Sequence, residues 1–360
     1  MELKQWFVRL GWGCMSMIHT KFPGKLFLMG EYAIMELGQV AVIAAVDRFL
    51  NVYIEKADDF EIRSAYGHLQ GTEIFMQNEI LIHVKAAIEI SRRYLKYQKI
   101  KMEPFKITID SELDADDHQK YGFGSSGVVV VAVVDAILKQ HAIHAEPIEL
   151  FKLSVMAQVI VGEMSSGGDL ASTCFGGIIA YRRYDETWLI LEDMSNMELV
   201  HTDWPGLMIH AMQTDCFKLC VGWSGNANST TPYVEKVREL SELEPYYYQM
   251  FLLSAERTVG DFIKGCENRD FSMIKKAVEL YRGLMCDLGH HADLMIETPK
   301  LKGLIECAET FNLPAKISGS GGGDCGFALL PENFHEKEPR LLHEWEKHGI
   351  LYLDVGVYET

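Results

Sequence analysis

The spacing of apolar residues predicts strands and helices that are mixed along the chain. Alternating apolar and polar residues, or a short apolar run, indicate a strand, whereas apolar residues three and four positions apart indicate a helix. Because these elements follow one another without a steady strand–helix–strand repeat, we expect an α+β fold rather than a parallel doubly wound sheet. The predicted strands cover residues 25–29, 40–46, 51–55, 61–64, 105–109, 177–182, 207–212, 219–223, 315–317, 327–330 and 350–358. The predicted helices cover residues 80–97, 128–138, 148–162, 231–240, 246–267, 273–288 and 299–310.

The composition changes near residues 185–205, and we take this region as the boundary between two domains. A chain of 360 residues is long enough for two, and Trp204-Pro205-Gly206 predicts a turn before the next strand. We therefore place the first domain at residues 17–195 and the second at residues 196–360. Residues 1–16 contain neither the long apolar core nor the cleavage site of a signal peptide, so we interpret them as an upstream extension that adds little to the fold.

The charge composition argues against two classes of partner. The chain has 51 acidic residues against 34 Lys and Arg residues, and the resulting net charge of −17 is unfavourable for nucleic acid and for an anionic membrane surface. Hydrophobic residues make up 48% of the chain, enough for a substantial core, but no apolar run is long enough to span a bilayer. The eight cysteines are scattered without C-x-x-C or zinc-type spacing, so we expect reduced thiols and a cytoplasmic location.

The segment that says most about function runs from Lys316 to Leu329 and has a glycine-rich centre at residues 318–323. Glycines in such a loop lose much backbone entropy on folding. Their usual use is close approach of the backbone to a phosphate or to another part of the chain. A tight turn or bulge is the alternative, which the length and composition of the segment make the less favoured interpretation.

A second segment, Lys120 to Gly127, joins glycines and serines to the start of a predicted helix. The apolar run 128–138 follows it, and we expect Ser125 or Ser126 to cap this helix. A glycine loop at a helix N-terminus suits an anion, because free N–H groups and the positive end of the helix dipole meet there. The pattern G-x-G-x-x-G occurs here without the strand that precedes it in a dinucleotide-binding fold, and the chain has no P-loop motif.

Phosphate binding by so acidic a chain requires cations that are placed locally. Lys21, Lys25 and Lys120 flank the glycine segments and are our candidates for this role. They would offset the repulsion between two anionic substrates. A single lysine is more often a solvated surface charge, so each of the three is a separate hypothesis.

Three segments of this chain resemble motifs of the GHMP kinase superfamily and occur in the same order, at residues 23–32, 122–127 and 316–328. Within the superfamily the chain is most similar to bacterial-type phosphomevalonate kinases, because of further segments at residues 168–172, 220–224 and 296–299. This resemblance covers residues 17–360. It implies a two-domain GHMP kinase fold with an N-terminal α+β nucleotide-binding domain and a C-terminal ferredoxin-like domain, and an active site between them.

The resemblance also implies an activity, which is transfer of the γ-phosphoryl group of ATP to the phosphate of 5-phosphomevalonate, with Mg²⁺, in the mevalonate route to isoprenoids. It implies catalytic roles for Asp169, Lys21 and Lys25. Nucleotide contacts are implied at Lys120, Gly122, Gly124, Ser125, Ser126 and Gly127. Substrate contacts are implied at Ser166, Gly168, Ser320, Gly321, Gly322 and Asp324, and Mg²⁺ ligands at Ser126 and Glu163.

The chemistry of a phosphate acceptor limits what Asp169 has to do. Phosphoryl transfer depends mainly on positioning and charge neutralisation, and a phosphate monoester with a second pKa of about 6 is already largely an oxyanion at neutral pH. We therefore expect Asp169 to orient the acceptor and to pair with a lysine as much as to remove a proton. Glu163 precedes Asp169 by 6 residues (169 − 163), closer than the Mg²⁺-binding glutamate of alcohol-phosphorylating relatives, so a solvated or capping glutamate is the alternative to a metal ligand.

Two other functions fit parts of the pattern. One is another enzyme of the superfamily, such as mevalonate kinase or diphosphomevalonate decarboxylase, and Gly222-Trp223 and Gly323-Asp324-Cys325 argue against both. The other is a non-catalytic binding protein with the same fold. The presence of Asp169 argues against that alternative, because a protein that only binds would not need this carboxylate.

Overall fold

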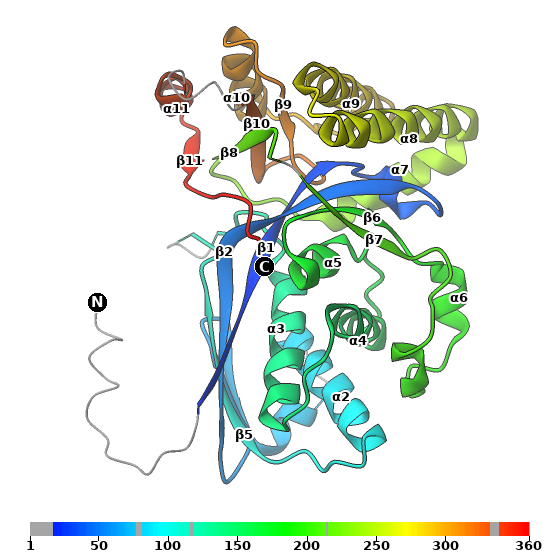
Figure 1. Ribbon diagram of the computed structural model, residues 1–360, viewed down its shortest axis with the longest axis vertical. Coiled ribbons are helices and arrows are strands. Elements are labelled where there is room, and N and C mark those ends of the chain that lie inside the picture. Colours follow the sequence, from blue (N-terminus) through cyan, green and yellow to red (C-terminus); the bar gives the residue numbers. More distant parts are fainter. Residues whose placement is uncertain (1–16, 77–80, 116–118, 214, 332–337, 360) are drawn as a thin grey trace.

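The computed structural model describes residues 17–76, 81–115, 119–213, 215–331 and 338–359, and Figure 1 shows its two units, one above the other. Residues 1–16, which we expected to add little to the fold, lie outside the described residues. Each unit combines one sheet with several helices. The expected α+β class is confirmed.

In the described part of the chain, the lower unit contains a seven-stranded sheet with the order β4-β3-β5-β2-β6-β7, and β1 pairs with β2 off this path. The long strand β2 pairs with β1 along one edge and, along the other, with β6 through residues 40–44 and with β5 through residues 50–56. The strands are β1 (Ile18–Met29), β2 (Val40–Lys56), β3 (Glu61–Ser64), β4 (Gly67–Gln70), β5 (Phe105–Ser111), β6 (Ile178–Arg182) and β7 (Met208–Met212).

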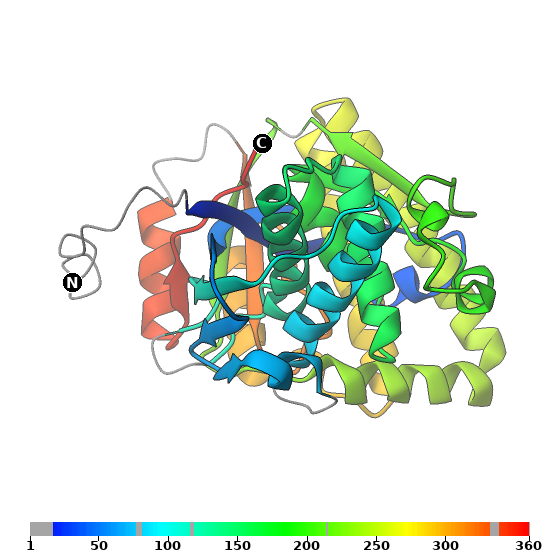
Figure 2. The same ribbon diagram turned by 90° about the horizontal axis from the view of Figure 1, so that it is seen from below.

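Helices α2 to α5 gather on one face of this sheet, as the cyan-to-green helices in Figures 1 and 2 show. Helix α3 lies at the centre, packed on β1 and β2 and against α2, α4 and α5. Its apolar residues surround the helix on all sides, which is the pattern of a helix buried in a core. The elements of this unit are η1 (Ala33–Met35), η2 (Gly71–Phe75), α2 (Ile82–Tyr97), α3 (Ser125–Gln140), α4 (Pro147–Ile160), α5 (Gly168–Phe175), α6 (Glu186–Leu191) and η3 (Met197–Val200).

The upper unit contains a four-stranded antiparallel sheet, counted over the described residues from 215 onward, with the order β11-β8-β10-β9. Helices α9 and α10 pack on this sheet, and α8 packs on α9. None of the described helices is both long and apolar enough to cross a bilayer. The elements are β8 (Phe217–Trp223), α7 (Thr230–Leu243), α8 (Pro245–Glu267), α9 (Phe271–His291), α10 (Pro299–Thr310), β9 (Ala315–Ile317), β10 (Cys325–Pro331), α11 (Glu338–Lys347) and β11 (Leu351–Leu353).

Two segments that we assigned to the second domain belong to the first sheet. Strand β7 pairs with β6, so the turn at residues 204–206 reverses the chain within one sheet and is not a linker. The chain also returns to this sheet after β11, because Tyr358 N donates to Ala45 O at 2.9 Å and accepts through its carbonyl from Gly177 N at 2.6 Å. The boundary predicted at residue 195 is therefore wrong, as is the single closing strand predicted over residues 350–358.

Candidate active site

Three segments that lie far apart in the sequence meet around Lys25. The backbone N–H of Lys25 donates to Phe123 O at 3.0 Å, and its Nζ donates to Gly122 O at 2.8 Å. Gly122 in turn lies directly against Asp324, since a Cβ on this glycine would come 2.7 Å from Cβ of Asp324. The segments around residues 25, 122 and 324, which carry the resemblance to GHMP kinases, thus form one site.

Asp169 lies in the first turn of helix α5, against the start of helix α3. Gly167 is the N-cap of this helix, with a φ of 72°, and the helix begins at Gly168. A Cβ on Gly127 would lie 2.8 Å from Cγ of Asp169, so the absence of a side chain at residue 127 makes room for the carboxylate. The positive end of helix α5 favours the ionised form of Asp169.

The pKa of Asp169 reflects opposing influences. Burial raises the pKa of this carboxyl, while the Lys25 ammonium and the backbone N–H groups of Leu170 and Asp169 lower it, and the net shift is upward. Glu163 adds a smaller upward influence. The side chain still keeps partial contact with solvent within this crowded environment. Lys25 is therefore the largest of the influences that favour the ionised form of Asp169.

Helix α3 starts with two serines in its first turn. Gly124, with a φ of 79°, is the N-cap and makes no side-chain cap hydrogen bond, so the prediction that Ser125 or Ser126 caps the helix is wrong. Both serines are instead the first helical residues, and both are partly exposed. The first amides of a helix have no earlier carbonyl within it, and they point along the axis where an anion would bind.

The glycine-rich segment packs closely on its own protein rather than offering all of its N–H groups. Gly322 N donates to Ile296 O at 2.9 Å, and a Cβ on Gly322 would lie 2.5 Å from Cζ of Tyr233. Asp324 N donates to Asn226 O at 2.7 Å. The N–H groups of Gly322 and Asp324 are thus engaged internally, which contradicts a role as free phosphate donors.

The remaining substrate candidates of this segment are placed differently from one another. Gly321 is buried, and a Cβ on it would lie 2.8 Å from Cγ2 of Ile296. Ser320 is partly exposed, and the Cβ direction of the neighbouring Gly319 faces open space. Burial raises the pKa of the Asp324 carboxyl, and hydrogen bonding from the backbone of Asn228 and the charges of nearby lysines lower it. Residues 319–320 are therefore the part of the segment that is open to a ligand.

The three candidate lysines do not all lie at the site. Lys25 is partly buried at the centre of the site, and the exposed Lys120 lies close enough to lower the pKa of Asp324. Lys21 is exposed, and its ammonium lies 4.0 Å from the centroid of the Phe49 ring. Between Pro23 and Gly24 the register of β1 against β2 shifts, because residues 47 and 48 of β2 have no partner in β1. The structure brings Lys25 and Lys120 to the site but not Lys21.

Glu163 is paired with a histidine that the sequence did not single out. Nε2 of His83 lies 3.1 Å from Oε2 of Glu163. Burial lowers the pKa of His83, whereas Glu163 raises it and Lys120 lowers it further. His83 lies in the first turn of an ordinary amphipathic helix, α2, so its sequence context carried no signal. Among the described residues, no three His, Cys, Asp or Glu side chains gather where they could hold a metal ion.

Ser166 and Gly168 shape the start of helix α5. Gly168 N donates to Oγ of Ser166 at 3.3 Å, and Tyr181 OH donates to Ser166 O at 2.8 Å. These bonds fix the turn that presents Asp169. Contact of either residue with a substrate stays a prediction.

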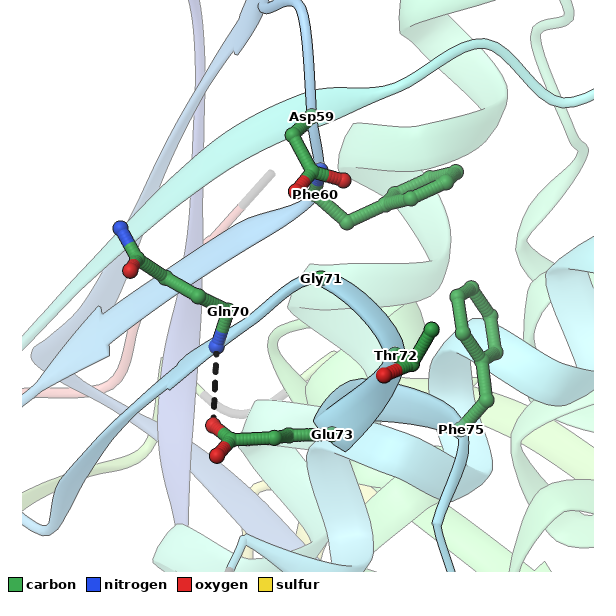
Figure 3. Close-up of a pocket in the computed structure, with 7 residues that line it drawn as sticks. All are labelled: Asp59, Phe60, Gln70, Gly71, Thr72, Glu73 and Phe75. Carbon is green, nitrogen blue, oxygen red and sulfur yellow. Dashed lines mark hydrogen bonds between the residues drawn. The ribbon is translucent and has the colours of Figure 1, made fainter.

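A separate hollow on the lower unit shares no residue with this site. Figure 3 shows it beside β3, β4 and η2, where the backbone N–H of Gln70 donates to Glu73 Oε2 at 3.4 Å. It is lined by Asp59, Phe60, Gln70, Gly71, Thr72, Glu73 and Phe75.

Both parts of the chain match models of one protein family. The GHMP kinases N terminal domain matches residues 82–177, and the GHMP kinases C terminal model matches residues 262–350. The phosphomevalonate kinase of Streptomyces sp. (strain CL190) is 30% identical, over 92% of this chain and 94% of that protein. The chain belongs to the GHMP kinase family.

Solved structures resemble this GHMP kinase over almost its whole length. The Streptococcus pneumoniae phosphomevalonate kinase in complex with phosphomevalonate and AMPPNP has a TM-score of 0.84 and 28% identity, covering 94% of this chain and 99% of that one. A Listeria innocua protein has a TM-score of 0.89 and 30% identity, covering 96% of this chain and 98% of that one.

Proposed function

We propose that this GHMP kinase is a phosphomevalonate kinase, which transfers the γ-phosphoryl group of ATP to the phosphate of 5-phosphomevalonate. The observation that carries this proposal is the likeness, over nearly the full length of both chains, to an enzyme solved with phosphomevalonate and AMPPNP. The family match and the similarity to the Streptomyces enzyme agree with it.

The start of helix α3 is the proposed site of the ATP phosphates. Residues 122–127 bring backbone amides, two serine hydroxyls and the positive end of a buried helix to one place. The exposed Lys120 lies beside this segment and adds a positive charge. In an otherwise acidic protein, this is a local region suited to a polyanion.

Lys25 and Asp169 are the proposed groups that act on the acceptor. An oxygen of the acceptor phosphate attacks the γ-phosphorus, a new P–O bond forms, and the bond from the γ-phosphorus to the oxygen that bridges it to the β-phosphate breaks, so that ADP leaves. Lys25 reduces the repulsion between the two phosphates, and Asp169 holds Lys25 and orients the acceptor. Because the acceptor is an oxyanion at neutral pH, Asp169 need not remove a proton from most acceptor molecules.

Ser126 and Glu163 are the proposed Mg²⁺ ligands. The charge of Glu163 contributes to the raised pKa of Asp169, and a carboxylate and a hydroxyl supply oxygen ligands of the kind that Mg²⁺ takes. In kinases Mg²⁺ is commonly held by one or two carboxylates together with substrate phosphates, where it neutralises charge. Because Nε2 of His83 lies 3.1 Å from Oε2 of Glu163, a bound Mg²⁺ would compete with His83 for this carboxylate.

The proposed location is the cytoplasm. Seven of the eight cysteines lie within the described residues, and all seven are free thiols. Unpaired buried cysteines are typical of a reducing compartment.

One assay tests the proposed function against its alternatives. ATP and Mg²⁺ are supplied with mevalonate, phosphomevalonate or diphosphomevalonate separately, and ADP release is measured. Of the three acceptors, we expect only phosphomevalonate to be turned over. Turnover with mevalonate would reassign the chain to mevalonate kinases, and nucleotide binding without turnover of any of the three would favour a binding protein. An Asp169→Asn variant purified in the same way controls for contaminating kinases.

A further inference from the structure

We propose that Glu31 and Lys316 are positioning residues that hold the open part of the glycine-rich segment, residues 319–320, over the acceptor site. This inference rests on the proposed function, because the substrate whose binding it affects is phosphomevalonate. Neither side chain is part of the site described above. Glu31 follows the end of strand β1 in the lower unit, and Lys316 lies in strand β9 of the upper unit.

The two side chains form an ion pair that is closed off from water. The exposed fraction is 0% for the side chain of Lys316 and 3% for that of Glu31. Nζ of Lys316 donates to Oε1 of Glu31 and also to Ile317 O, the latter at 2.7 Å. The ammonium lies 5.7 Å from the ring centroid of Tyr281 and 5.2 Å from that of Phe327. A charge held in this way has a fixed position, since aromatic rings and an anion surround it.

A second bond joins the same two segments a few residues further on. Tyr32 OH donates to Ser320 O at 2.7 Å, and burial raises the pKa of Tyr32, so its hydroxyl stays protonated as a donor. Tyr32 has a φ of 60°, which is unusual for a residue other than glycine and indicates backbone strain. Consecutive residues 31 and 32 therefore hold residue 316, which precedes the turn at Gly319 and Ser320, and residue 320 within that turn.

Stability alone gives no reason for this arrangement. Replacement of a buried ion pair by apolar side chains of similar volume is often neutral or stabilising, because burial of two charges costs more than their attraction returns. Here the cost is higher still, since Oε2 of Glu31 is buried without a hydrogen-bond partner. Tyr281 OH also donates to Glu31 O at 2.8 Å, so the side chains of Lys316 and Tyr281 both bind residue 31. What the arrangement provides is a fixed register between the Lys25 segment and the glycine-rich segment.

The decisive variant is the double substitution Glu31→Gln with Lys316→Met, which removes both charges and keeps both shapes. A single Lys316→Met would bury an unpaired carboxylate and is expected to destabilise the chain strongly. We expect the double variant to fold, with nearly unchanged nucleotide affinity, but with a KM for phosphomevalonate raised at least about tenfold. If the ion pair only stabilised the fold, its removal would not raise the KM for phosphomevalonate while the nucleotide affinity stays the same.

Two further variants complete the test. Tyr32→Phe removes only the hydroxyl that binds Ser320 O, and we expect the same rise in the KM for phosphomevalonate, smaller in size, with little change in melting temperature. The matched control is Lys218→Met with Glu338→Gln, which makes the same chemical changes in an ion pair that lies wholly within the upper unit. The control should leave both KM values within about twofold.

The outcomes separate this inference from the proposed function. If the wild-type chain turns over phosphomevalonate and the folded double variant keeps both KM values and kcat within about twofold, the positioning role is wrong. If the double variant does not fold, Tyr32→Phe decides, and unchanged kinetics in that variant overturn the inference. If the wild type accepts only mevalonate, the proposed function fails, and the same comparisons made with mevalonate still test the positioning role.

Discussion

The contact between Gly127 and Asp169 predicts a substitution that damages catalysis more than folding. Gly127 lies inside helix α3, where alanine is the better helix former by about 1 kcal/mol. Its Cβ, however, would come 2.8 Å from Cγ of Asp169 and closer still to Oδ2. Gly127→Ala should therefore push the carboxylate away while it strengthens the helix.

The size of the effect follows from the distance. Ordinary van der Waals contact for a Cβ begins at 3.4 Å, so Cγ of Asp169 must retreat by 3.4 − 2.8 = 0.6 Å, and Oδ2 must move further. A misplacement of about 1 Å in a catalytic group can lower turnover on the order of 100-fold, or about 2.7 kcal/mol. The carboxylate is the free end of a short side chain, so its displacement should change the free energy of unfolding by no more than about 1 kcal/mol.

The assay is steady-state kinetics with ATP and phosphomevalonate, combined with urea unfolding. We expect kcat to fall about 100-fold, the KM for ATP to change little, and the unfolding midpoint to stay close to that of the wild type. Gly283→Ala is the matched control, because this glycine lies within helix α9 and a Cβ there meets no atom within 4 Å. A Gly127→Ala variant with turnover within about twofold of the wild type would refute the reasoning, and so would an equal loss in the control.

Three further predictions concern four substitutions. Asp169→Asn should lower kcat at least about 100-fold and keep nucleotide affinity. Because burial raises the pKa of this carboxyl, its ionised form at pH 7 opposes folding, and the Asn variant should have a higher melting temperature at pH 7 than the wild type. A lower melting temperature would contradict the upward pKa shift. Lys25→Met should raise the KM for phosphomevalonate by an amount equivalent to about 2 kcal/mol, whereas Lys21→Met should leave it within about twofold; equal effects of the two would contradict their different surroundings. Gly222→Ala places a Cβ 2.7 Å from Cδ1 of Leu304 and 2.8 Å from Cγ2 of Ile350, so it should lower the free energy of unfolding by about 1–3 kcal/mol, and an unchanged urea midpoint would contradict the packing.

The fold class and the centre of the site could be predicted from local sequence signals. Helix α3 has an apolar run that only a buried helix or strand accommodates, and glycine and serine residues precede it. The motif around Asp169 was found by resemblance, and the structure places this residue beside Lys25 and the start of α3. These signals are local in the sequence, and they predict the structure correctly where the tertiary packing favours the same local conformation.

Features that depend on distant partners could not be predicted. A turn such as residues 204–206 has the same sequence whether it links domains or reverses a chain within a sheet, so β7 was assigned to the wrong unit. The register shift between β1 and β2 at Pro23-Gly24, where residues 47 and 48 of β2 have no partner, has no other mark in the sequence. Glycine at residue 322 indicates that another group lies close to the backbone, but it does not say which group, and in the structure that group is the side chain of Tyr233. The pairing of Glu31 with Lys316 spans 285 residues.

The return of the chain to its first sheet limits when that sheet can be finished during synthesis. Asp47 N donates to Gly356 O at 3.1 Å, and Gly356 N donates to Oδ1 of Asp47 at 2.7 Å. These bonds cannot form until the ribosome has made residue 356, whereas the strands they complete are made long before. The whole upper unit is synthesised in between, and until then residues 45–47 of β2, which lie between the pairings with β6 and β5, lack these partners. Domains usually fold in order as they emerge, but here the one that is begun first is completed last.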